Sequence, residues 1–144
     1  MRTSLNGFLA ATTLIAALGL FHVGVPAGET SVIGVWRLAS YLRENPTSGE
    51  KLSKEFNDNS GGSLIYTAGG RMSVLLKAAN LVTYAGRFTV AGDKILHHVE
   101  VSNIPDFVGW DLERSVEISG NRMTLKAKSM FSDTKYTLVW ERIE

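Results

Sequence analysis

The sequence of 144 residues contains no cysteine, which excludes a disulfide framework, a thiol nucleophile and a thiolate metal site. It has no long run of like charge, and its formal net charge is only +1. Both features argue against a nucleic-acid-binding protein, which would normally carry a basic stripe. The sequence also lacks a phosphate-binding loop, a dinucleotide fingerprint and a G-x-S-x-G elbow, so we expect no cofactor.

Charged residues are also absent from Thr3 to Gly28, although Arg2 precedes this segment. Leu9 to Leu20 is strongly apolar, and Val25-Pro26-Ala27 has the small residues of a signal-peptidase site. This pattern predicts a secretory signal peptide over residues 1–27 and a mature domain over residues 28–144. An uncleaved membrane anchor is the alternative, since about 20 apolar residues span a bilayer. With cleavage, we expect a periplasmic or secreted protein that is not attached to a membrane.

The mature chain alternates apolar and polar residues with the period of β-strands and has no long amphipathic helix. We predict eight strands, and we interpret Asn45 to Gly62 as a long connection with a possible helical turn around Leu52–Phe56. On the first strand, Trp36, Leu38 and Leu42 share one face and Tyr41 lies on the other. The expected strands cover residues 31–43, 63–67, 71–77, 83–90, 94–101, 112–118, 122–128 and 136–142. Short turns between eight antiparallel strands favour an all-β, up-and-down barrel that can hold one small ligand.

Two turns fix which residues face each other. A three-residue loop at Ala68-Gly69-Gly70 would place Tyr66 opposite Met72. The turn at residues 91–94 would place Phe88 opposite His97. The same turn predicts the pairs Val90–Ile95 and Tyr84–Val101, so these side chains should all face the barrel interior.

A third turn is expected at Pro105-Asp106, which suits the centre of a type I turn. It predicts that His97 faces Arg114 and that Val99 faces Leu112. A wider loop would shift this register by an even number of residues and leave the shared inward face unchanged. Gly120-Asn121 is a two-residue hairpin signal that turns Met123 and Leu125 inward.

The ordered motifs resemble the bacterial and fungal lipocalin-like domain family within the calycins. The matching segments are Gly34-x-Trp36, Leu64–Thr67 with Gly70–Val74, Tyr84–Phe88, His97–Glu100, Val108-Gly109, Arg114 and Leu138–Arg142. The resemblance implies an eight-stranded barrel with a cavity, closed at one end by Arg142 packing on Trp36. Only residues 78–82 join the third and fourth strands, where relatives often carry a helix, and Trp110 could partly replace that cover.

The candidate site centres on His97 and Arg114, two polar residues on the inward face of adjacent strands. A buried polar group needs a partner or a function. We expect a ligand-binding cavity lined by His97, Arg114, Tyr66, Tyr84, Phe88, Met72 and Trp110. The alternative is that His97 and Arg114 only satisfy backbone carbonyls, a buried water or a carboxylate. His98 and Glu100 point outward, and adjacent histidines on a strand point apart, so we expect no metal site.

The leading functional hypothesis is an extracytoplasmic binding or carrier protein for a small hydrophobic or amphipathic molecule. The alternative is an isomerase, cyclase or lyase of the lipocalin-like kind. In that enzyme His97 would be the acid or base and Arg114 the electrostatic stabiliser. A third hypothesis is an interaction module that uses the barrel exterior. The outward positions count against it because they are mostly charged, which disfavours an exposed apolar patch.

Overall fold

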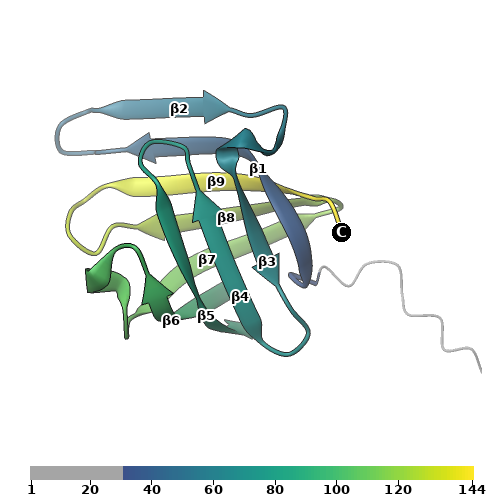
Figure 1. Cartoon of the computed structure of the whole chain (residues 1–144). Coiled ribbons are helices and arrows are strands. Elements are labelled where there is room, and N and C mark those ends of the chain that lie inside the picture. The colour runs from purple at the N-terminus through teal and green to yellow at the C-terminus, as the bar shows by residue number, and fades with distance from the viewer. Residues whose placement is uncertain (1–30) are drawn as a thin grey trace, which may run out of the picture.

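The computed structural model describes residues 31–144, which form one nine-stranded antiparallel sheet with two short 3-10 helices, η1 (Asn59–Gly61) and η2 (Pro105–Phe107) (Figure 1). The strands are β1 (Gly34–Glu44), β2 (Lys51–Glu55), β3 (Gly62–Tyr66), β4 (Arg71–Leu76), β5 (Val82–Ala91), β6 (Lys94–Ser102), β7 (Asp111–Ser119), β8 (Arg122–Lys128) and β9 (Lys135–Arg142). The predicted signal peptide lies outside the described residues. Within them, no helix is long and apolar enough to cross a membrane.

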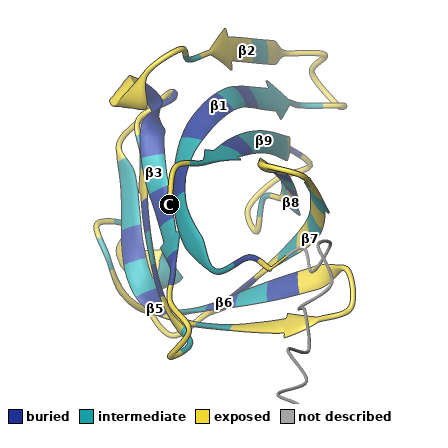
Figure 2. Cartoon of the chain, turned by 90° about the vertical axis from the view of Figure 1, so that its right-hand side faces the viewer, coloured by how far each residue is buried: buried dark blue, intermediate teal, exposed yellow. Residues whose placement is uncertain are grey.

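The sheet closes because β1 pairs with β9 as well as with β3. The closed barrel therefore consists of β1 and β3 to β9, as Figure 2 shows. The predicted eight-stranded antiparallel barrel is confirmed.

β2 is an additional strand outside this ring, paired with the second half of β1 (Figure 2). The prediction of an irregular connection with a helical turn is wrong at this point. The segment KLSKE has a single apolar residue, Leu52, so it has no apolar face to indicate a strand. It is a strand because β1 is longer than β3 and offers backbone groups at residues 40–44 that β2 satisfies.

The register of two hairpins is as predicted. Tyr66 faces Met72 across β3 and β4, and Phe88 faces His97 across β5 and β6. Both hairpins have short loops with Gly70 and Gly92 at positive φ. The register was predicted from these glycine-containing loops. Gly120, also at positive φ, forms the predicted two-residue hairpin between β7 and β8.

A bulge in β6 changes the end of the β5–β6 pair. Tyr84 faces Ser102 instead of the predicted Val101, because the register shifts between Ala85 and Gly86. Val101 therefore points outward and is 61% exposed. A β-bulge adds one residue to one strand and interrupts the alternation of faces, and sequence periodicity does not reveal it.

The predicted pairing of β6 with β7 is wrong by two residues. Arg114 faces Ile95, and His97 faces Leu112. The connection is wider than the expected type I turn, since residues 103–110 include η2 and a further turn before β7 begins. The even shift keeps His97 and Arg114 on the same inward face, as diagonal neighbours on adjacent strands.

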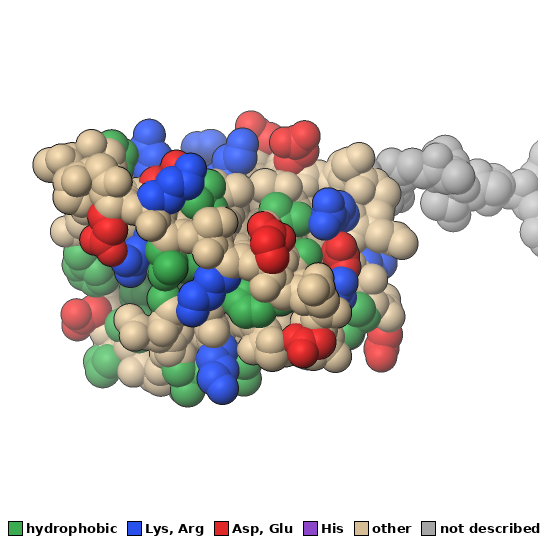
Figure 3. Space-filling view, turned by 90° about the horizontal axis from the view of Figure 1, so that it is seen from above, with side chains coloured by type: hydrophobic (Ala, Val, Ile, Leu, Met, Phe, Trp, Pro, Cys, Tyr) green, Lys and Arg blue, Asp and Glu red, His purple; other side chains and the backbone are tan. Residues whose placement is uncertain are grey.

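The end of the barrel opposite η2 is closed by a buried aromatic core. Trp36 is fully buried and its indole donates to the carbonyl of Val32 at 2.9 Å. The Arg142 guanidinium lies over the Trp36 ring, 4.1 Å from its centroid, and donates to the carbonyls of Ile33 and Ser31. On the outer face seen in Figure 3, Lys and Arg side chains alternate with Asp and Glu, so charges of opposite sign are interspersed.

Candidate ligand-binding cavity

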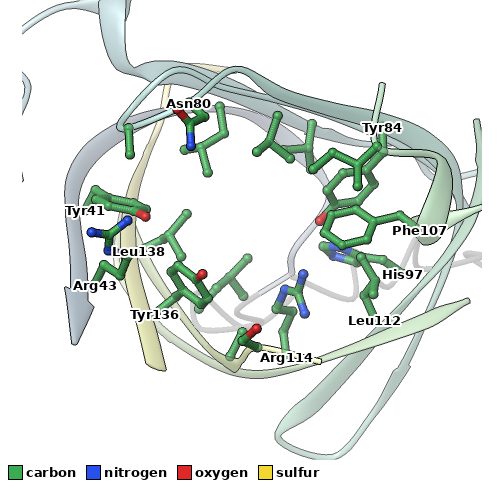
Figure 4. A pocket seen from close by; sticks show the side chains of 18 of the residues that line it. Tyr41, Arg43, Asn80, Tyr84, His97, Phe107, Leu112, Arg114, Tyr136 and Leu138 are labelled. Atoms are coloured by element: carbon green, nitrogen blue, oxygen red, sulfur yellow. The ribbon is translucent and has the colours of Figure 1, made fainter. Parts of the chain in front are cut away.

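The barrel holds a cavity of about 520 Å³ at the end opposite Trp36 (Figure 4). Its walls are mainly aliphatic side chains of the barrel strands: Leu64, Val74, Leu76, Val82, Leu112, Leu125, Ala127 and Leu138. Three connections contribute its outer part, through Ala79, Asn80 and Leu81, through Ile104 and Phe107, and through Ser129, Met130 and Phe131. Among residues 31–144, no Asp or Glu lines it. The cavity is therefore apolar with a small number of polar groups, as small-molecule sites usually are.

His97 is the most buried polar residue of the cavity wall, at 1% exposed. Both ring nitrogens have a tyrosine partner: the Tyr66 hydroxyl lies 2.6 Å from Nε2 and the Tyr84 hydroxyl lies 2.8 Å from Nδ1. The strands β3, β5 and β6 each supply one of the three residues. The structure thus gives this buried imidazole two partners within the protein.

The imidazole of His97 is neutral. Burial lowers its pKa well below the ordinary histidine value, and the positive charge of Arg114 lowers it further, with a smaller contribution from His98. Burial also raises the pKa of Tyr66 well above its usual value, and Tyr84 adds to this shift. Both groups therefore remain uncharged around neutral pH, so this part of the cavity acts through hydrogen bonds.

Arg114 is the charged group next to this cluster. Its side chain extends from β7 beside His97 and Leu112 (Figure 4). It makes one hydrogen bond, from Nη1 to the carbonyl of Glu113 at 2.9 Å, and it has no ion-pair partner within residues 31–144. The other two cations of the cavity, Arg43 and Lys128, are paired with Glu50 and Asp133. Arg114 is thus the cavity cation that lacks a carboxylate partner in the described chain.

The structure brings some of the predicted site residues together and separates others. His97, Arg114 and Tyr84 line the cavity. Tyr66, Met72 and Phe88 are not part of the wall; the Phe88 ring packs on Tyr66 with centroids 4.7 Å apart, behind His97. Trp110 is placed incorrectly by the prediction. It is 56% exposed and does not line the cavity, to which the same connection contributes Ile104 and Phe107.

Tyr41 is a cavity residue that the sequence pattern placed on the opposite face. A register shift between Leu38 and Ser40 reverses the alternation along β1, so Tyr41 turns inward and is 4% exposed. Its ring lies 6.2 Å from that of Tyr136. No sequence signal marks this bulge. Tyr136 itself was recognisable, since it alternates with Leu138 and Trp140 on β9.

His98 lies on the outer surface, as its alternation with His97 indicates. It contacts Asp111 at 2.6 Å and Thr89 at 3.0 Å across β7 and β5. Glu100 is also exposed and pairs with Arg71 and Arg87. Among the described residues, no three His, Asp or Glu side chains come together in a group that could hold a metal ion.

Together these features define a closed antiparallel β-barrel of the lipocalin-like type, with a mainly apolar cavity at one end. The sequence model of the lipocalin-like domain family matches residues 77–143, from the β4–β5 connection to the end of β9. This match confirms the resemblance indicated by the ordered sequence motifs. A search of curated proteins found no match.

Solved structures similar to this chain include two bacterial proteins and one design. A lipocalin-like protein from Bacteroides uniformis is 18% identical, with a TM-score of 0.46, and the alignment covers 77% of this chain and 97% of that one. A protein from Bacteroides eggerthii is 14% identical, with a TM-score of 0.46 and coverage of 76% and 98%. A de novo designed fluorescence-activating β-barrel is 12% identical, with a TM-score of 0.47 and coverage of 76% and 92%.

Proposed function

We propose that this protein binds and carries a small hydrophobic or amphipathic molecule in the barrel cavity. The observation that supports this most directly is the cavity itself, about 520 Å³ and lined mainly by aliphatic and aromatic side chains. Ligand sites for small organic molecules usually have volumes between about 300 and 1,000 Å³. Burial of an apolar ligand against these walls would supply the binding free energy.

An enzymatic role for His97 has less support. A general acid or base needs a ring nitrogen that can reach the substrate, and both nitrogens of His97 are engaged by Tyr66 and Tyr84. Its lowered pKa also keeps the ring unprotonated near neutral pH, so the ring has no extra proton to give. These contacts favour a binding function over catalysis by this residue.

We further propose that the protein acts outside the cytoplasm, in the periplasm or secreted. The support is the sequence of residues 1–27, which has the charged start, apolar centre and small-residue end of a signal peptide. Intact-mass measurement of protein recovered from the extracytoplasmic fraction should give a chain that begins at Gly28. A full-length chain that stays in the cytoplasm would contradict this proposal.

Titration with the neutral fluorescent probe N-phenyl-1-naphthylamine tests the binding proposal. We expect saturable fluorescence enhancement with the wild-type protein. Ala127→Trp should abolish it, because Ala127 lines the cavity and a larger side chain would fill the space. Lys126→Trp is the matched control: it adds the same side chain one residue away on the exposed face of β8. Equal binding by both variants, or no binding by the wild type, would contradict a cavity site.

A further inference from the structure

The Tyr66–His97–Tyr84 cluster contains one more polar hydrogen than the hydrogen bonds between its three side chains require. Each tyrosine hydroxyl carries one hydrogen, and the neutral imidazole carries one N–H. The cluster makes two hydrogen bonds, at 2.6 Å to Nε2 and at 2.8 Å to Nδ1. Two hydrogens are therefore used, and the third must point away from the cluster, either at its Tyr66 end or at its Tyr84 end.

The two ends have different surroundings. Tyr66 is 1% exposed, packs against Phe88, and within residues 31–144 its hydroxyl has His97 as its only hydrogen-bond partner. Tyr84 lines the cavity. A buried hydroxyl hydrogen without an acceptor is costly, whereas a hydrogen at the cavity can be satisfied by water or by a ligand. The third hydrogen therefore belongs to Tyr84.

This assignment fixes the direction of both hydrogen bonds. Tyr66 donates its hydroxyl to Nε2 of His97, and Nδ1–H donates to the oxygen of Tyr84. The hydroxyl of Tyr84 is then free to donate into the cavity. The two hydrogen bonds of His97 thus make Tyr84 a donor toward a ligand, and Tyr66 and His97 are the residues that position it.

Arg114 presents a second donor to the same part of the cavity (Figure 4). It lies diagonally across from His97 on the neighbouring strand, and the guanidinium can only donate hydrogen bonds. Within the part of the chain that the structure describes, no Asp or Glu lines the cavity to accept from it. Two donors, one of them charged, thus meet at the inner wall, while the remaining walls are mainly apolar.

We propose that the ligand has an anionic acceptor head, such as a carboxylate, that is bound by the Arg114 guanidinium and the Tyr84 hydroxyl, with an apolar body in the rest of the cavity. This inference rests on the proposed binding function and specifies the ligand class. A charged acceptor suits Arg114 because guanidinium–anion hydrogen bonds are stronger than neutral ones. A ligand whose head is only a donor, such as an ammonium group, would meet donors and a positive charge.

Two probes with a common aromatic skeleton test the acceptor head. N-phenyl-1-naphthylamine is neutral, and 8-anilinonaphthalene-1-sulfonate adds a sulfonate to the same skeleton. With the wild-type protein we expect the sulfonate to bind about tenfold or more tightly than the neutral probe. Arg114→Gln should reduce the ratio to about one, and Tyr84→Phe should reduce it severalfold; the ratio is taken within each variant, so that a change in the cavity that affects both probes cancels. Lys126→Gln removes the same charge from the outer face and should leave the ratio unchanged.

The outcomes separate this inference from the proposed function. Failure of both probes to bind would reject the binding function and the inference with it. Binding of the neutral probe with a ratio near one in the wild type, or a high ratio that persists in Arg114→Gln, would overturn the acceptor-head proposal alone.

The positioning role of Tyr66 and His97 has a spectroscopic readout. Long-range proton–nitrogen NMR correlation of the imidazole distinguishes the two neutral tautomers. We expect Nδ1 of His97 to carry the hydrogen. An Nε2–H tautomer would place the spare hydrogen at Tyr66 and overturn the assignment of Tyr84 as a donor.

Discussion

Arg142 and Trp36 form the contact that closes the barrel where its first and last strands meet. They face each other across β1 and β9, and the guanidinium carbon lies 4.1 Å from the centroid of the indole ring. The same guanidinium donates to the carbonyls of Ser31 and Ile33. One side chain therefore joins the C-terminal strand, the aromatic core and the segment that precedes β1.

Removing this side chain should destabilise the fold. Arg142→Ala loses a cation–π contact and leaves two carbonyls without their charged donor, so we expect the free energy of unfolding to fall by about 2–3 kcal/mol. Urea denaturation followed by tryptophan fluorescence measures this change. Lys126 is exposed and has no ion pair with another described residue, so Lys126→Ala should remain within about 0.5 kcal/mol of wild type. A similar loss in both variants would argue against a specific role for Arg142.

The close approach of β5 and β6 at the bulge should make residue 86 intolerant of any side chain. A Cβ at Gly86 would lie 1.9 Å from the carbonyl oxygen of His98 and 3.0 Å from the amide nitrogen of Glu100. Since both are backbone atoms, we expect Gly86→Ala to lower the free energy of unfolding by about 3 kcal/mol or more. Gly69→Ala is the control, because its nearest neighbour would be Thr67 Oγ1 at 3.9 Å. A melting temperature of Gly86→Ala equal to that of Gly69→Ala would disprove the close packing.

The neutral His97 predicts a specific pH dependence of stability. Its folded-state pKa lies well below the unfolded value of about 6.5, so the unfolded chain binds a proton that the folded protein excludes. Stability should be fully present above pH 6.5 and should decline as the pH falls toward 5, by at most about 1.4 kcal/mol per pH unit. Urea midpoints measured across this range test the slope.

A matched pair of variants shows which histidine causes this pH dependence of stability. His97→Gln should flatten the slope between pH 6.5 and 5, because the buried imidazole is gone. His98→Gln, on the outer surface, should retain it. Loss of the slope only in His98→Gln would assign the effect to the wrong histidine and refute the prediction.

The hydroxyl of Tyr66 should contribute to stability as well as to the orientation of Tyr84. Tyr66→Phe leaves Nε2 of His97 buried without a partner, which should cost about 1–3 kcal/mol. Tyr136→Phe removes a hydroxyl that has no hydrogen-bond partner among the described residues, so it should have little effect. Thermal denaturation of the two variants compares them directly, and equal melting temperatures would contradict a structural role for the Tyr66–His97 hydrogen bond.

Turn chemistry made much of the barrel predictable from the sequence. Gly70 and Gly120 occupy positive-φ turn positions, and the short loops around them leave one register for each hairpin. Alternating apolar residues then place Tyr66 and His97 inside the barrel. The fold class and the inward faces of most strands follow from these two local rules.

Irregularities in backbone pairing were not predictable. The bulges in β1 and β6 turn Tyr41 inward and Val101 outward; the first lies against the distant strand β9 and the second against the neighbouring strand β5, and neither has a sequence signal. The wider β6–β7 connection shifted Arg114 from a position opposite His97 to a diagonal one. The sequence pattern placed His97, Tyr66 and Tyr84 inside the barrel, but the hydrogen bonds that join them, across 31 and 13 residues of chain, were not predicted.

β2 has a consequence for the behaviour of the protein in concentrated solution. A closed barrel has no free strand edge, but β2 lies at the end of the sheet and, among the strands of residues 31–144, pairs with β1 alone, so it adds a free edge. Exposed edges can pair with edges of other molecules and start aggregation. Here the edge is only five residues long and carries Lys51, Lys54 and Glu55. Its shortness and its charges are features that disfavour pairing of this edge with the sheet of another molecule.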